Sequence, residues 1–515
     1  MLKGQATAEQ TKAYADRMWA KNPRISPNSW RIAQELTVGK IGLGTYRMGD
    51  DPEHKKAMEK ALLSGINLID TSTNYMDGKS EHLIGETLGA LCETGKLKRE
   101  EVVLVSKAGY MQGKTLLKHQ HTPPPETIQL DEHLWHCIHP DFLKEELENS
   151  LKRLGVECID IYMLHNPEYF LQYAYNSAED KDALDIAVLK KLYYTHIEKA
   201  FTFLEQAAHE GKIQYYGVSS NTFGAAKDKI DHTDLAEVFT AAQNAAQNAW
   251  GRKKRPLFRA IELPYNLLEL GVLKNINTEA QVINGTEEVS TLELATRMHL
   301  TVLTNRPLNA FPEGNAAYRL SAGYKPGSEP MDIERILPEI HALEESLATT
   351  IGGWPMVDEQ PLFHFGQQGD DLIASLQNAI HFDFVKENFF MLHLSTLRSA
   401  VEQIKQEQHE KSAKLDDITT NYALFFNQLI AALREKFRAQ DAEHLKPLEH
   451  IVRDRLKGDW KNAPMQQVAL NAAASTPGVT SVLCGLRDPA YIQDVTTIYE
   501  QGDFVDVATV IGSNS

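Results

Sequence analysis

The chain is poor in cysteine, in long hydrophobic runs and in basic residues. Its four cysteines are spread over 515 residues without a Cys-x-x-Cys pair, so we expect free thiols in a reducing compartment. No stretch is apolar enough to cross a bilayer, and the polar segment 1–24 lacks the core of a secretory signal. We therefore expect a cytoplasmic protein without a membrane partner. A net charge of −17 argues against a nucleic-acid partner.

Short β-branched and aliphatic runs alternate with amphipathic segments along most of the chain. This pattern is typical of buried parallel strands separated by covering helices, which is the α/β class. Eight strands are predicted, the number that a closed (β/α)8 TIM barrel needs. They span residues 40–43, 67–70, 102–106, 159–164, 214–218, 261–265, 301–304 and 480–483.

One stretch that does not fit a minimal barrel lies between Lys107 and Pro140. It contains three consecutive prolines, Pro123 to Pro125, so it cannot be regular secondary structure throughout. We interpret it as an ordered excursion over the active-site face that shapes the substrate pocket.

A second such stretch, 324–461, has apolar stripes at helical spacing, for example Leu394, Leu397 and Val401. It is too long for an ordinary loop and predicts a helical insertion between strands 7 and 8. We expect residues 1–323 to hold strands 1–7, the insertion to pack on the barrel, and 462–515 to complete the barrel with strand 8. A lid or a partner subunit would also cover the apolar stripes.

Polar residues end several of the predicted strands. Asp70, Lys107 and His165 each follow a buried run, and Tyr75 comes one short turn after Asp70. Because reactive groups of such barrels lie at the carboxyl ends of the strands, we expect these four side chains to share one cavity.

These four residue types suit hydride transfer to a carbonyl group. The new alkoxide needs stabilisation and a proton, and a tyrosine hydroxyl supplies both. A lysine ammonium beside the tyrosine favours the phenolate, and an aspartate holds that lysine charged. A histidine can donate a hydrogen bond to the substrate oxygen.

The motifs also match a known family in its order. They are Gly42-Leu43-Gly44-Thr45, Asp70 to Tyr75, Lys107 at a strand end, Leu164-His165-Asn166-Pro167, and Gly211-Lys212-Ile213 before Gly217-Val218-Ser219. Over about residues 30–324, and again from about 464, the chain resembles the aldo-keto reductases. The resemblance implies an oxidoreductase that uses NADP(H), or NAD(H), on an aldehyde, ketone or sugar-like alcohol. It also implies Asp70, Tyr75, Lys107 and His165 as the catalytic tetrad, with Tyr75 as general acid and base.

The cofactor positions match this family less well than the tetrad. Glu262 stands where the family commonly has glutamine, Asn305 where it stacks a tyrosine, and Tyr491 where it has a longer polar or basic side chain. Arg306 and Arg487 follow strands 7 and 8, where barrel enzymes often bind phosphate. We therefore expect only a mild preference for NADP. The full predicted cofactor set is Gly44, Thr45, Asp70, Ser219, Ser220, Glu262, Asn305, Arg306, Leu308, Gly485, Arg487 and Tyr491.

A cluster of histidines and a cysteine invites a zinc assignment. His133, His136, Cys137 and His139 lie close together, but they fit no standard ligand spacing. His139 directly precedes Pro140 at a predicted helix start, where it can cap the helix. We predict no metal site.

Two functional hypotheses follow from the sequence. The tetrad favours an active NAD(P)-dependent reductase or dehydrogenase. Glu262, Asn305 and the helical insertion favour instead a catalytically weak, reductase-like protein that binds cofactor and serves regulation. The insertion also offers a surface for a protein partner or an oligomer contact.

Overall fold

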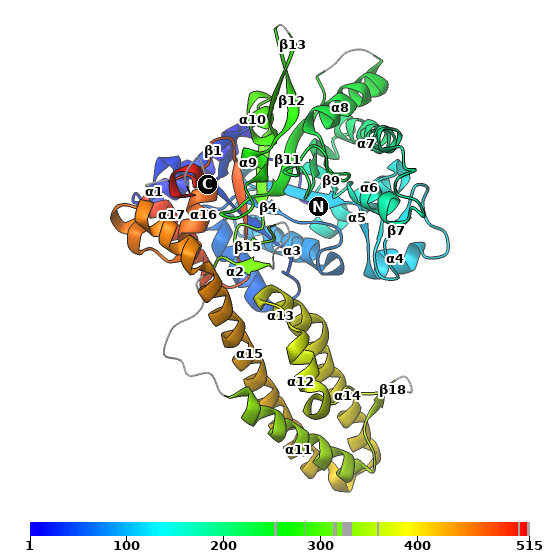
Figure 1. The fold of residues 1–515 in the computed structure, drawn as a ribbon. Coiled ribbons are helices and arrows are strands. Elements are labelled where there is room, and N and C mark those ends of the chain that lie inside the picture. The colour runs from blue at the N-terminus through cyan, green and yellow to red at the C-terminus, as the bar shows by residue number, and fades with distance from the viewer. Residues whose placement is uncertain are drawn as a thin grey trace. The chain divides into compact units, whose positions relative to one another are not determined.

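The structure, a computed structural model, describes residues 1–251, 255–283, 285–312, 317–321, 332–357, 360–502 and 505–511. The chain forms two compact units (Figure 1). The barrel unit comprises Met1–Leu308 and Gln466–Ser515, and the helical unit comprises Asn309–Met465. Within the described ranges, no helix has the length and apolar character needed to span a membrane.

Eight parallel strands of the barrel unit close into a barrel in the order β10-β11-β14-β19-β3-β4-β5-β9. Each corresponds to one of the predicted strands, so the predicted fold class is confirmed. The strands are β3 (Ile41–Gly44), β4 (Leu68–Asp70), β5 (Val103–Ala108), β9 (Ile159–His165), β10 (Ile213–Ser219), β11 (Phe258–Pro264), β14 (Thr301–Asn305) and β19 (Ser481–Gly485).

Alternate residues of these strands fill the barrel. One buried cluster joins side chains from six of the strands, and its strand members are Leu68, Val103, Val105, Ile161, Met163, Ala260, Leu303 and Leu483. Because side chains alternate along a strand, residues two positions further on point to the same side. This places Asp70, Lys107, His165 and Glu262 on the barrel's inner face, next to its apolar core.

Helices cover the outside of the barrel, as their apolar faces require (Figure 1). Pro140 begins one of them, with His139 accepting a hydrogen bond from the Asp141 N–H, and Gly155 ends it at φ 63°. The predicted cap and end are therefore confirmed. The helices of the barrel unit are α1 (Ala8–Lys21), α2 (Pro52–Leu62), α3 (Lys79–Glu93), α4 (Gly113–His119), α5 (Pro140–Leu154), α6 (Tyr169–Asn176), α7 (Ile186–His209), α8 (Leu235–Trp250), α9 (Gly271–Lys274), α10 (Thr291–Arg297), α16 (Met465–Ser475), α17 (Tyr491–Gln501) and α18 (Val507–Ile511).

Three small sheets accompany the barrel. The predicted excursion after Lys107 contains the short strands β6 (Tyr110–Met111), β7 (Ile128–Gln129) and β8 (Trp135–His136), joined in the order β6-β8-β7. The other two are hairpins, β1 (Trp30–Ala33) with β2 (Leu36–Gly39) and β12 (Ile276–Val282) with β13 (Gly285–Ser290).

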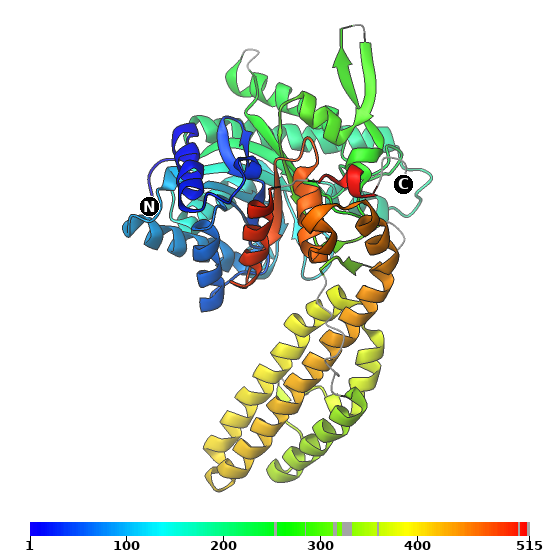
Figure 2. The ribbon, with the colours of Figure 1, turned by 90° about the vertical axis from the view of Figure 1, so that its left-hand side faces the viewer.

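The helical unit is built on a core of its own. Residues predicted as helical stripes, among them Leu394, Leu397, Val401 and Phe426, are buried in one cluster. The long helix α15 packs beside α11 and α14, as the two views in Figures 1 and 2 show. The elements are α11 (Ile333–Ile351), α12 (Phe365–Ser375), α13 (Ala379–Val385), α14 (Met391–Glu407), α15 (Ser412–Arg455), and the short strands β15 (Asn309–Ala310), β16 (Tyr318–Arg319), β17 (Met356–Val357) and β18 (Gln360–Pro361).

The helical unit lies between β14 and β19, where the insertion was predicted. Its limits, Asn309 and Met465, are wider than the expected 324–461, because the strands β15 and β16 belong to it. The expected first residue, Tyr324, lies outside the described residues. That the insertion packs on the barrel stays a prediction.

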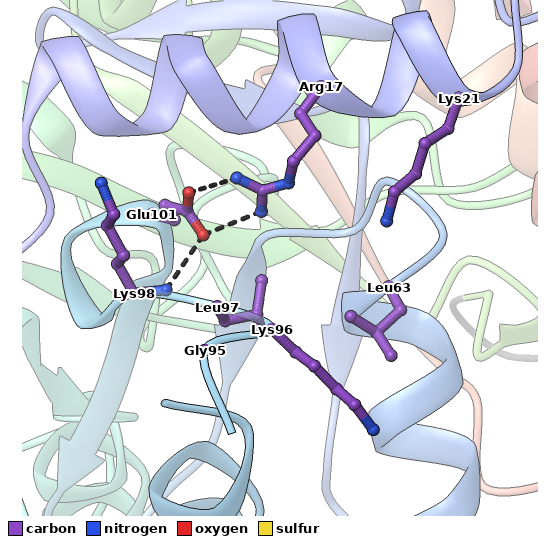
Figure 3. A pocket seen from close by; sticks show the side chains of 8 residues that line it. All are labelled: Arg17, Lys21, Leu63, Gly95, Lys96, Leu97, Lys98 and Glu101. Carbon is purple, nitrogen blue, oxygen red and sulfur yellow. Dashed lines mark hydrogen bonds and ion pairs between the residues drawn. The ribbon is translucent and has the colours of Figure 1, made fainter. Parts of the chain in front are cut away.

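A cavity of about 440 Å³ opens on the barrel unit beside α1 (Figure 3). Its lining residues are Arg17, Lys21, Leu63, Gly95, Lys96, Leu97, Lys98 and Glu101. Glu101 accepts two hydrogen bonds from Arg17, of 2.5 and 2.9 Å, which neutralises part of the basic lining. Leu63 precedes β4, and Lys98 precedes β5, so the cavity lies at the amino ends of these strands. None of the predicted site residues lines it.

Candidate active site

The eight barrel strands bring a ring of predicted site residues to one end of the barrel. Neighbouring strands pair Gly485 with Gly44, Gly44 with Asp70, and Ser219 with both His165 and Glu262. Asn305 ends β14, and Lys107 lies one residue before the end of β5. The carboxyl ends of the strands are where such barrels carry their reactive groups.

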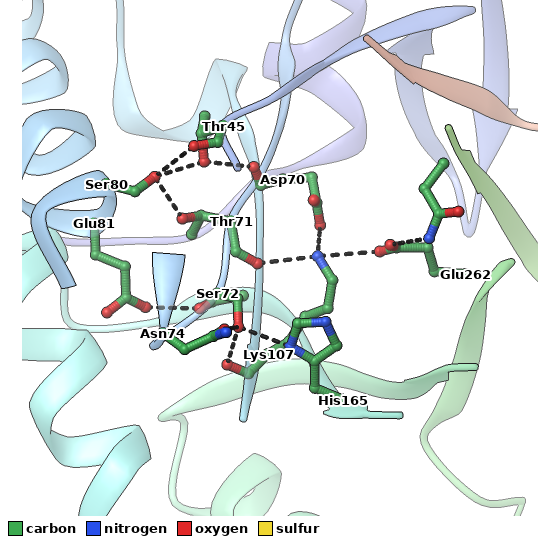
Figure 4. A network of polar contacts seen from close by, with 12 residues as sticks. Thr45, Asp70, Thr71, Ser72, Asn74, Ser80, Glu81, Lys107, His165 and Glu262 are labelled. Atoms are coloured by element: carbon green, nitrogen blue, oxygen red, sulfur yellow. Dashed lines mark hydrogen bonds and ion pairs between the residues drawn. The ribbon is translucent and has the colours of Figure 1, made fainter. Parts of the chain in front are cut away.

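Lys107 is the centre of this ring (Figure 4). Its side chain is 0% exposed. The ammonium Nζ donates to Asp70 Oδ1, which ends the neighbouring strand, and to the Thr71 carbonyl oxygen at 3.0 Å. A buried lysine needs such partners, because desolvation penalises an unpaired charge heavily. Asp70 is thus brought to Lys107, as the sequence predicts.

Glu262 contributes a second carboxylate to the same ammonium. Its Oε2 lies 3.1 Å from Lys107 Nζ, and its Oε1 accepts a hydrogen bond of 2.8 Å from Asn305 Nδ2. Burial, and next the charge of Glu262, raise the pKa of Asp70 well above its usual value. Burial opposes the charge on Lys107, but Asp70 and Glu262 outweigh it, so the pKa of Lys107 is raised.

Tyr75 stands at the beginning of a strained turn after β4. The next two residues, Met76 and Asp77, have φ of 50° and 56°, in the left-handed region that non-glycine residues rarely adopt. The tyrosine ring is half-buried, with its centroid 5.3 Å from Lys107 Nζ and 5.9 Å from the ring of His165. Burial raises the pKa of Tyr75, whereas the charge of Lys107 lowers it.

His165 is held by a residue that the sequence analysis did not single out. Its Nδ1 lies 2.9 Å from Ser72 Oγ, and the edge of the Tyr110 ring packs against it at 4.6 Å between centroids. Burial, then the charge of Lys107, lowers the pKa of His165 well below its usual value. The imidazole is therefore neutral near pH 7 and has one N–H to donate.

The arrangement joins an acid, a cation and a neutral donor. Tyr75 can give or take a proton, the Lys107 charge bears on its phenol, and His165 can donate a hydrogen bond to an oxygen beside Tyr75. These are the groups that a carbonyl reduction or an alcohol oxidation requires.

Several of the predicted cofactor residues lie among the site residues at this end of the barrel, and others follow the strands. Thr45 is buried and donates its hydroxyl to the Asp70 carbonyl oxygen at 2.8 Å, and Ser220 donates its N–H to the Glu262 carbonyl oxygen at 3.0 Å. Leu308 is half-buried, Gly485 and Tyr491 are exposed, and Arg487 is half-buried. Arg306 pairs with Glu269 at 3.1 Å.

The histidine cluster after Lys107 has other partners. His136 Nε2 lies 2.7 Å from the His165 carbonyl oxygen, and His139 caps α5. Within the ranges that the structure describes, no group of three metal-ligating side chains comes together. His136 thus belongs to the surroundings of His165.

Sequence reasoning missed three residues around the site. Ser72 lies inside the Asp70 to Tyr75 motif, and its position two residues after Asp70 was the available signal. Tyr110 and His136 reach His165 only through the small sheet β6-β8-β7, whose strands are too short to show a period. The contact of Glu262 with Lys107 was also not predicted.

Comparison with known proteins shows which family this sequence resembles. The sequence model of the Aldo/keto reductase family matches residues 40–310. The NADH-specific methylglyoxal reductase of Escherichia coli is 26% identical over 266 residues, which cover 49% of this chain and 70% of that protein. The aldo-keto reductase yakc (NADP(+)) of Schizosaccharomyces pombe is 29% identical over 189 residues, covering 36% of this chain and 43% of that protein.

A solved glycerol dehydrogenase from Gluconobacter oxydans is similar over 95% of this chain and 98% of its own, with 17% identity and a TM-score of 0.43. The chain spans less than half the length of the Schizosaccharomyces pombe relative. Residues 40–310, which the family's sequence model matches, are more than half of the 515-residue chain. The chain belongs to the aldo/keto reductase family.

Proposed function

We propose that the protein is a nicotinamide-dependent oxidoreductase that interconverts a carbonyl compound and its alcohol, with Tyr75 as the proton donor and acceptor. The single observation that supports this most is the convergence of Asp70, Tyr75 and His165 on the buried ammonium of Lys107. A buried cation beside a phenol favours the phenolate, which makes the tyrosine a usable acid and base.

The side chains at the carboxyl ends of β11 and β14 suit a nicotinamide carboxamide. Glu262 Oε2 and Asn305 Oδ1 are buried and, among the described residues, accept no hydrogen bond. An amide –NH2 group supplies the donors that such oxygens lack. Ser219 ends the adjacent strand β10 and Ser220 follows it, and both add hydroxyl groups at this end of the barrel. When bound, the nicotinamide supplies the hydride, and the chain's own residues hold and move the proton.

We propose NADP(H), with NAD(H) as a second cofactor. Relatives named for each cofactor support this, one NADH-specific and one for NADP(+). Arg306 and Arg487 suit phosphate contacts, although Arg306 has to exchange its ion pair with Glu269 for a phosphate. Isothermal titration with each cofactor measures the preference, and a thousand-fold difference either way contradicts a mild one.

A second candidate is a cofactor-binding protein with weak turnover. The observation that favours it is the pairing of Lys107 with Glu262, because this second carboxylate draws the ammonium's charge from Tyr75. Cofactor binding without turnover on any substrate of a broad aldehyde, ketone and sugar panel selects this candidate.

The test is Tyr75→Phe, which keeps the ring and removes the hydroxyl. General acid catalysis contributes about 10²–10⁴-fold, so we expect turnover to fall by at least about 100-fold while the cofactor dissociation constant changes less than about threefold. Turnover is followed at the absorbance of the reduced cofactor, with methylglyoxal in the panel because a relative is named for it.

The matched control is Tyr215→Phe. Tyr215 lies near the start of β10, where it pairs with Ile161. It packs against the barrel's interior cluster, away from the carboxyl ends of the strands that carry the site. Loss of the Tyr215 hydroxyl should change turnover by less than about twofold from wild type. If Tyr75→Phe keeps more than a tenth of wild-type turnover, Tyr75 is not the acid, and His165 becomes the candidate.

A further inference from the structure

The Lys107 ammonium has three N–H groups and faces three protein oxygens. It donates to Asp70 Oδ1 and to the Thr71 carbonyl oxygen, and Glu262 Oε2 lies 3.1 Å away. Glu262 Oε2 is ion-paired with the ammonium without a hydrogen bond, so Glu262 and the tyrosine oxygen are rivals for the attraction of this charge. The competitor is a full negative charge, whereas the tyrosine offers a neutral oxygen until it ionises.

Glu262 is fixed in this position. Its side chain is 2% exposed, Asn305 Nδ2 donates to its Oε1, and its backbone carbonyl accepts the Ser220 N–H. Its Oε2 has the ion pair with Lys107 but no hydrogen bond. The carboxylate therefore has little freedom to turn away from the ammonium.

With both carboxyl groups ionised the local charge balance is negative, and the raised pKa of Asp70 is the response of the site to that excess. Across the described ranges, Lys107 is the one cation paired with Asp70 or Glu262. Among the described residues, further titratable groups that face the site are Tyr75 and Tyr46 from the turns after β4 and β3. Tyr110 of β6 packs against His165 of β9, which is neutral. Two buried carboxyl groups share one ammonium.

We propose that Glu262 is a positioning residue that draws the charge of Lys107 away from Tyr75 and thereby favours the protonated, acid form of Tyr75 over its phenolate. The acid form serves carbonyl reduction and the phenolate serves alcohol oxidation, so Glu262 biases the site towards reduction. The charges agree with this: after burial, which raises the pKa of Tyr75 most, Lys107 lowers it and Asp70 and Glu262 raise it.

The test is Glu262→Gln, which keeps the shape and the acceptor for Asn305 and removes the charge. The phenolate absorbance of the cofactor-free protein is titrated with base, and the titration of the corresponding Tyr75→Phe protein is subtracted to isolate Tyr75. Losing a nearby negative charge favours the phenolate, so we expect the Tyr75 ionisation to move to lower pH by about one pH unit or more. An unchanged or more alkaline ionisation overturns the proposal.

Two further variants guard the interpretation. Glu262→Ala removes the carboxylate altogether and should move the ionisation in the same direction, and it replaces Glu262→Gln if that protein does not fold. Glu146→Gln is the matched control: Glu146 is also a buried barrel-unit carboxylate, but it lies on α5 among Asn149 and Arg153. An equal shift in Glu146→Gln overturns a specific role of Glu262.

The inference shares its site with the proposed function, but the titration needs no turnover and so separates the two. With turnover, the pH profiles of alcohol oxidation and of carbonyl reduction should both move to lower pH in Glu262→Gln. A phenolate shift without turnover on any substrate contradicts the proposed function alone. Turnover without a phenolate shift contradicts the role of Glu262 alone.

Discussion

The two units each bury a glutamate almost completely, but the two glutamates differ in what they bond to. Glu262 in the barrel unit and Glu344 in the helical unit are both 2% exposed. Glu344 Oε1 accepts from the Phe365 N–H at 2.8 Å and from the Tyr422 hydroxyl at 3.2 Å, and its Oε2 accepts from the Gly366 N–H at 2.9 Å. Glu262 has one neutral donor, Asn305, and a share of Lys107.

The difference separates a structural carboxylate from a functional candidate. Glu344 binds the first N–H groups of α12, which no helical carbonyl can reach, and thereby joins α11, α12 and α15. Its bonds are complete within the unit. Around Lys107 the charges are unbalanced and Glu262 Oε2 lacks a hydrogen bond, which leaves capacity for a ligand. Burial alone therefore does not mark an active site, and the feature that singles out Glu262 is an unbonded carboxylate oxygen beside a buried ammonium.

Glu344→Leu should have the largest effect on stability. It leaves two backbone N–H groups without an acceptor, at about 1–3 kcal/mol for each, whereas the Tyr422 hydroxyl keeps His393 Nε2 at 2.9 Å. We therefore expect a loss of at least about 2 kcal/mol. Urea unfolding followed by circular dichroism measures it. The neighbouring Glu345 is 70% exposed in its side chain and provides the control, because Glu345→Leu should change stability by less than about 0.5 kcal/mol. Equal effects of the two variants contradict the structural role of Glu344.

The same contrast explains what the sequence could and could not reveal. The barrel strands were predictable because their buried runs are continuous. Asp70, Lys107 and His165 were proposed as site residues because they end such runs, and Tyr75 because it follows Asp70 by one turn. Glu262 stands two positions after Ala260 on the same inner face, so its direction was predictable, but its contact with Lys107 joins residues far apart in the chain. Such contacts depend on which strands become neighbours. The limits of the helical unit depend on β15 and β16, which are too short to predict from a pattern.

Asp441 is a third buried carboxyl group, and here burial disfavours the charged form. It is 5% exposed in α15, its Oδ2 has no hydrogen bond, and burial raises its pKa to about 6. A raised pKa means that the folded state binds the proton more tightly than the unfolded state. This contribution to stability is present below the ordinary pKa of 3.8 and is lost as the pH rises through about 6.

Asp441→Asn should therefore stabilise the protein near pH 7 by roughly 1–3 kcal/mol and should have little effect near pH 4. Urea unfolding at both pH values, for wild type and variant, measures the difference. A variant that is destabilised near pH 7, or stabilised equally at both values, shows that burial of the Asp441 charge is not the cause.

Ser72→Ala should have the smallest effect, and it acts on geometry instead of charge. A neutral imidazole carries its proton on one nitrogen, and the partner of the other nitrogen decides which. The one hydrogen of the Ser72 hydroxyl has three acceptors in reach: Asn74 Oδ1 at 2.7 Å, His165 Nδ1 at 2.9 Å and the Lys107 carbonyl oxygen at 3.1 Å. When it goes to His165 Nδ1, the imidazole proton stays on Nε2, where it can face the substrate oxygen. Without the hydroxyl, both tautomers of the neutral His165 imidazole can be populated. One neutral hydrogen bond is worth about 1 kcal/mol, so we expect turnover to fall about fivefold with little change in cofactor affinity.

The adjacent Thr73 is the matched control for Ser72, because its buried hydroxyl has no hydrogen-bond partner among the described residues. Thr73→Ala should change turnover by less than about twofold from wild type. The two variants together separate a specific contact with His165 from a general loosening of the turn between Asp70 and Tyr75. Equal losses mean that the turn, and not the tautomer of His165, is disturbed. A loss of turnover in Ser72→Ala of about 100-fold or more means that Ser72 itself takes part in proton transfer. The expectation that Ser72 only orients His165 is then wrong.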